Sequence, residues 1–108
     1  MKEIPNLNYI NRLSKGNKVF AKNLVDIIKK ELPREVETYQ LHLNEGDFDK
    51  TAEDVHKINH KIKILGLENG CRMAEEYRIG LLKKSIKLKQ DFESILTSML
   101  IFIEKVYV

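Results

Sequence analysis

The sequence predicts an all-α fold, an antiparallel up-and-down four-helix bundle preceded by one short extra N-terminal helix. Four long segments carry apolar residues at steps of three and four, the period of a helix with one buried face, and no segment alternates apolar and polar residues as a strand does. The composition agrees, because only 5 Gly and 2 Pro occur in a chain rich in Leu, Ile, Lys and Glu. Short links between long helices favour the antiparallel arrangement.

Length and composition indicate one soluble domain over residues 1–108. With 43% hydrophobic and 32% charged residues, the chain matches folded domains and can bury a single core. The longest apolar run, residues 99–103, is too short to span a bilayer, and the N-terminus lacks a signal-peptide core, so we expect a cytoplasmic protein without a membrane segment. One cysteine excludes an internal disulfide, and the net charge of +3 permits nucleic-acid binding without predicting it.

The first two predicted helices are a short one and a long one, after an unstructured lead over residues 1–6. The short helix covers residues 7–14 and ends before Gly16, and Asn17 is suited to cap the helix that follows. The apolar positions of the long helix are Phe20, Leu24, Ile27, Ile28, Leu32, Val36, Tyr39 and Leu43. Pro33 lies inside it. Because the apolar stripe continues in phase past this proline, we predict a kink rather than a break.

The third predicted helix follows the turn at residues 44–46 and ends near Gly66. Asp47 can cap it, and Asp49 lies in its first turn, where the helix dipole favours negative charge. Its apolar positions are Phe48, Ala52, Val55, Ile58, Ile62 and Leu65. Beside them runs a polar line at spacings of three, four and seven, which shares one helix face and consists of His56, Asn59, His60 and Lys63.

Two further amphipathic segments complete the chain. We predict the last two helices over residues 67–81 and 92–106, with a basic connector over residues 83–89 between them. We expect the largest core contributions from Phe20, Ile28, Leu32, Val55, Ile62, Phe92, Leu96, Met99 and Phe102. We interpret Cys71 as a core residue and His42 as a surface residue of the second helix.

The residues around His56 have an ordered spacing. Gly46-Asp47 ends nine residues before His56, and Leu65-Gly66 stands nine and ten residues after it. Val55 precedes the histidine and Ile58 follows it by two. In this order and spacing the chain resembles the histidine-containing phosphotransfer (HPt) domain of two-component phosphorelay systems, and the resemblance covers nearly the whole chain.

The resemblance implies a function. An HPt domain accepts a phosphoryl group on one histidine, here His56, from the phospho-aspartate of a receiver domain and passes it to another receiver. Its partners would be response-regulator receiver domains and a hybrid sensor histidine kinase, and it would not be an enzyme in its own right. We expect a monomer with no cofactor, no metal, no nucleic acid and no membrane. The predicted partner-binding residues are Lys57, Asn59, His60, Lys61 and Lys63.

Two positions depart from the family pattern. Asn59 stands where the family usually has lysine, and His60 stands where it usually has a small residue. Lys57, Lys61 and Lys63 are candidates to replace the missing charge. Lysines surround the histidines, and no acid lies between Val55 and Leu65. We therefore expect this face to offer no carboxylate, and the Mg²⁺ used in transfer to sit in the acidic partner.

Other interpretations stay open at this point. If His60 is taken as the phosphorylated histidine, Lys63 and Gly70 fall at positions of the family pattern. The Gly-Asp spacing is then lost, so His56 is favoured. The His56-x-x-x-His60 spacing also suits two metal ligands on one helix, although Lys57 stands where a zinc protease needs glutamate. A basic nucleic-acid-binding bundle is a further candidate. The main alternative is an HPt-like bundle that binds a receiver domain without transferring phosphate.

Overall fold

The computed structural model describes residues 3–106, and these residues form helices, turns and loops without a strand. The helices are α1 (Asn8–Ser14), α2 (Lys18–Asn44), α3 (Phe48–Ile64), α4 (Glu68–Leu82) and α5 (Lys89–Lys105). The prediction of one short helix and four long ones is therefore confirmed. The Asn17 side chain accepts a hydrogen bond from the Phe20 backbone N–H, as expected of an N-cap, and α2 runs through Pro33 as a single helix.

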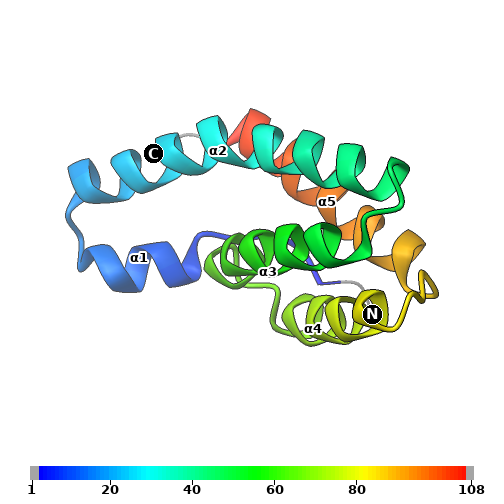
Figure 1. The fold of residues 1–108 in the computed structure, drawn as a ribbon. Helices are drawn as coiled ribbons and strands as arrows, with labels where there is room; N and C mark the ends of the chain where they lie inside the picture. The colour runs from blue at the N-terminus through cyan, green and yellow to red at the C-terminus, as the bar shows by residue number, and fades with distance from the viewer. Residues whose placement is uncertain (1–2, 107–108) are drawn as a thin grey trace.

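The helices pack into a compact body that measures 43 × 27 × 19 Å. Figure 1 shows α3 between α2 and α4, and these are its two main packing partners. Helix α5 packs against α2 and α4, while α1 packs against α2. Within residues 3–106, no helix combines the length and the apolar character needed to cross a membrane.

The centre of the core holds three aromatic rings from three helices. Tyr39 of α2, Tyr77 of α4 and Phe92 of α5 are all buried, and their ring centroids lie 5.1–6.3 Å apart. The two tyrosine hydroxyls are 2.7 Å apart, and that of Tyr39 also donates to Glu93 at 2.9 Å. Burial and these contacts raise the pKa of Tyr39, so the hydroxyl stays protonated and available as a donor.

The predicted core is confirmed at Ile28, Leu32, Val55, Ile62, Phe92, Leu96 and Met99, which are all buried. Phe102 is only partly buried, and the prediction for Phe20 is wrong, since that side chain is 47% exposed. The buried positions of α2 start one residue later, at Ala21, and continue in phase through Val25. An error of one residue turns a helix by about 100°, which is enough to move Phe20 from the core to the surface.

The start of the chain is packed rather than free, contrary to the expected unstructured lead. Both carboxylate oxygens of Glu3 accept hydrogen bonds, from the backbone N–H groups of Asn69 and Gly70 at 2.9 and 2.8 Å. The Asn6 backbone N–H donates to the Leu65 carbonyl at 2.9 Å. These bonds satisfy free N–H groups at the start of α4 and fasten residues 3–6 to the α3–α4 turn. The predicted lead at residues 1 and 2 lies outside the described residues.

Candidate functional site

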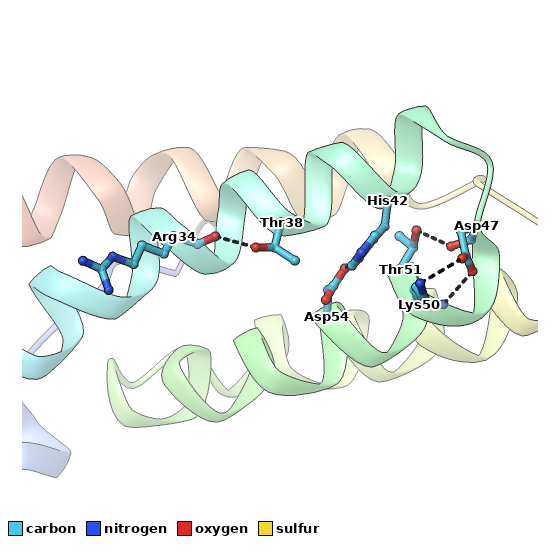
Figure 2. Close-up of polar contacts among 7 residues, drawn as sticks. All are labelled: Arg34, Thr38, His42, Asp47, Lys50, Thr51 and Asp54. Carbon is cyan, nitrogen blue, oxygen red and sulfur yellow. Dashed lines mark hydrogen bonds and ion pairs between the residues drawn. The ribbon is translucent and has the colours of Figure 1, made fainter.

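Helix α3 has well-defined ends, and the Gly-Asp and Leu-Gly pairs mark them. Asp47 is the N-cap, because its carboxylate accepts from the Lys50 backbone N–H at 3.1 Å, and the Thr51 hydroxyl donates to its carbonyl (Figure 2). Gly46 and Gly66 have φ of 73° and 81°, the left-handed region that glycine adopts most easily. The motif on either side of His56 thus sets where the helix begins and ends, and places His56 at its middle.

The face of α3 that meets α2 carries a buried polar pair. His42 Nδ1 of α2 lies 2.5 Å from Asp54 Oδ2 of α3, and the Asp54 side chain is 8% exposed (Figure 2). Our interpretation of His42 as a plain surface residue is therefore wrong. Because consecutive helix residues turn by about 100°, a residue two positions beyond Asp54 points away from α2. The pair thus sets the rotation of α3 that brings His56 to the outside.

Lys61 lies on the α2 side as well, and this corrects its expected place beside the histidines. Its ammonium is 3.0 Å from a carboxylate oxygen of Glu31 and 3.0 Å from one of Glu35, and its side chain is 10% exposed. Burial lowers the pKa of Lys61, but the hydrogen bonds to the two glutamates outweigh this effect and raise the pKa overall. A lysine held in this way cannot reach a phosphoryl group on the opposite side of α3.

The two histidines are exposed neighbours on α3. Their ring centroids are 5.1 Å apart in an edge-to-face arrangement. Lys57 and Lys63 are also exposed. Asn59 differs, because its Nδ2 donates to the Cys71 carbonyl of α4 at 3.3 Å. Its side chain is therefore engaged between α3 and α4 rather than displayed to a partner.

An open cleft of about 650 Å³ lies beside His56, between α3 and α4. Its polar lining comes from Asp49, Glu53, His56 and Lys57 of α3 and from Arg78 of α4. The expectation that this face offers no carboxylate is therefore wrong. Asp49 and Glu53 stand seven and three residues before His56, so helical spacing alone places them on the same face. These two carboxylates could therefore have been predicted from the sequence.

Sequence reasoning missed the contribution of α4 to the cleft. Arg78 makes two hydrogen bonds to Glu75, from Nε at 2.9 Å and from Nη2 at 2.5 Å. These bonds lower the pKa of the Glu75 carboxyl, and the charges of Arg78 and His56 act in the same direction. Glu75 and Arg78 follow His56 by about twenty residues, and only the packing of α4 on α3 brings them together.

Cys71 has no reactive character in this setting. It packs partly buried against the core, and burial raises the pKa of its thiol, which keeps the sulfur protonated. Within residues 3–106, no three His, Cys, Asp or Glu side chains gather closely enough to hold a metal ion.

Comparisons with protein-family models, with curated proteins and with solved structures found no match to this chain.

Proposed function

We propose that this protein is a phosphorelay intermediate of the HPt type that accepts a phosphoryl group on His56 from a receiver domain and passes it to another. In this proposal α2–α5 form the antiparallel bundle of that class, α1 is the extra helix, and the protein works in the cytoplasm. One observation carries the proposal. His56 is exposed at the middle of α3, beside an open cleft, and the Gly-Asp and Leu-Gly pairs lie at the two ends of that helix.

In this reaction the protein scaffold contributes mainly by positioning His56. A ring nitrogen of neutral His56 attacks phosphorus, an N–P bond forms, and the P–O bond to the donor aspartate breaks with its electron pair leaving on the carboxylate oxygen. The other ring nitrogen keeps its proton, and nothing is oxidised or reduced. Phosphoryl transfer depends mainly on alignment and on cations that offset the phosphoryl charge. The receiver domain would supply Mg²⁺, and the cations of this chain that line the cleft with His56 include Lys57.

A second candidate is a bundle that binds a receiver domain but does not transfer phosphate. The acidic side of the cleft favours it, because Asp49 and Glu53 line the cleft with His56, and a carboxylate repels an incoming phosphoryl group. The position three residues after His56 is Asn59, which contacts α4 and carries no charge. The two candidates share the docking partner and differ only in whether His56 becomes phosphorylated.

The test is incubation of the pure protein with phosphorylated receiver domains, followed by detection of base-stable, acid-labile phosphate. We expect label on wild-type protein and on His60→Gln, and none on His56→Gln, with unchanged helix content by circular dichroism because glutamine is a good helix former. Label on His56→Gln but not on His60→Gln would move the acceptor by one helical turn. Complex formation without any label would support the binding-only candidate.

A further inference from the structure

The region around His56 needs a cation that the motif does not provide. A phosphohistidine brings close to two negative charges, and Asn59 cannot offset them. Lys61 is held by Glu31 and Glu35 on the opposite side of α3. Lys63 lies seven residues, about two turns, further along the helix. Among the cations that line the cleft with His56 are Lys57 and Arg78.

Arg78 has the geometry and the accessibility to move. Its side chain is 28% exposed and that of Glu75 is 45% exposed, so water can replace either partner when the ion pair opens. A guanidinium binds phosphate through two parallel N–H donors, which a lysine cannot do. Arg78 already uses that fork on the two carboxylate oxygens of Glu75, and a phosphoryl group offers oxygens of similar spacing.

We propose that Arg78 is the phosphoryl-binding cation of this protein and that it exchanges Glu75 for the phosphoryl group when His56 is modified. This inference rests on the function proposed above. The phosphoryl charge that arrives at His56 repels the Glu75 carboxylate and attracts the guanidinium, so both forces favour the exchange. In the unmodified protein Glu75 holds Arg78 over the cleft. The α4 arginine thus replaces the lysine that the family pattern places on α3.

The experiment uses phosphoramidate as a small donor, so that no receiver surface is involved. A ring nitrogen of His56 attacks phosphorus, the P–N bond of the donor breaks, and ammonia leaves. Rates of labelling and of phosphohistidine loss are measured for wild type, Arg78→Gln, Arg78→Lys and Glu75→Gln. The matched control is Arg72→Gln, because Arg72 is exposed on the same helix and bonds to Asn69 outside the cleft. The Nε–H NMR signal of Arg78 is followed before and after labelling, with His56→Gln as the blank.

We expect Arg78→Gln to label about tenfold more slowly than wild type, because one charged donor to the developing anion is lost. The labelling rate of Arg78→Lys should lie between those of Arg78→Gln and wild type. Glu75→Gln should label faster than wild type, and Arg72→Gln should equal it. The Arg78 signal should shift on labelling of His56. These results support the exchange. The shift of the Arg78 signal on labelling of His56 has no explanation in a purely structural role for Arg78.

Two results would overturn the inference, and only the second would also overturn the proposed phosphotransfer function. If His56 is labelled while Arg78→Gln matches wild type and the Arg78 signal stays in place, Arg78 is not the phosphoryl-binding cation, and the phosphotransfer function stands. If neither phosphoramidate nor phosphorylated receivers label His56, the phosphotransfer function fails and this inference fails with it.

Discussion

The two faces of α3 use charged residues in opposite ways. Toward α2, Asp54 is bound to His42, Lys61 is bound to two glutamates, and both side chains are at most 10% exposed. Toward α4, His56, Lys57 and Arg78 surround an open cleft, and the Arg78–Glu75 ion pair there is exposed to water. Buried charges must stay paired, since separating them leaves an unsolvated charge, whereas exposed ones exchange partners easily. We infer that the α2 face holds α3 in place and that the α4 face is free to react.

The two faces of α3 depend on how each helix is rotated about its axis, and substitutions in the core should show the largest effect. Phe92 is fully buried among Tyr39 and Tyr77, while Phe20 is 47% exposed. We expect Phe92→Ala to lower the free energy of unfolding by about 3–5 kcal/mol and Phe20→Ala by much less. Urea unfolding followed by circular dichroism measures both. Equal losses would mean that α2 is rotated so that Phe20 faces the core.

A second test separates the two faces through their histidines. His42→Ala leaves the buried Asp54 carboxylate without its partner, and we expect a loss of about 1–3 kcal/mol in unfolding free energy. His56→Ala removes an exposed ring, and we expect a change within about 0.5 kcal/mol. Phosphate acceptance should show the reverse order, with His42→Ala active and His56→Ala inactive. If His42→Ala cost nothing, the α2 face would not be the one that holds α3.

A third test compares two lysines four residues apart. Lys61→Met breaks both contacts to Glu31 and Glu35 and should cost about 1–2 kcal/mol, between the values for exposed and buried ion pairs. Lys57→Met should leave stability nearly unchanged and weaken binding to a receiver domain, with a smaller effect at high salt. Titration calorimetry at two salt concentrations measures binding. Weakened binding by Lys61→Met at unchanged stability would show that Lys61 faces the partner after all.

The sequence predicted what depends on near neighbours in the chain. Asn17 and Asp47 cap helices as their residue types indicate, because a cap involves only the next three residues. The roles of His42, Lys61 and Arg78 were missed because each depends on a different helix. Lys61 was partly predictable, since it stands seven residues after Asp54 and shares its face, but nothing in the local pattern showed that α2 covers that face.

A substitution at Asn59 should have the smallest effect, and it tests whether a further cation on the α4 face speeds phosphate acceptance. Asn59→Lys restores the charge three residues after His56 that the family pattern has. The same change removes the 3.3 Å hydrogen bond from Asn59 to the Cys71 carbonyl, a partly buried contact worth about 1 kcal/mol. We therefore expect a modest loss of stability together with a severalfold gain in the rate of phosphate acceptance from a phosphorylated receiver. Asn59→Gln is the control, because it lengthens the side chain without adding charge.

If Asn59→Lys gained nothing over Asn59→Gln while Arg78→Gln was slow, the cleft would already hold its cation in Arg78. A gain by Asn59→Lys that also rescued Arg78→Gln would show that the two positions supply the same charge from different helices.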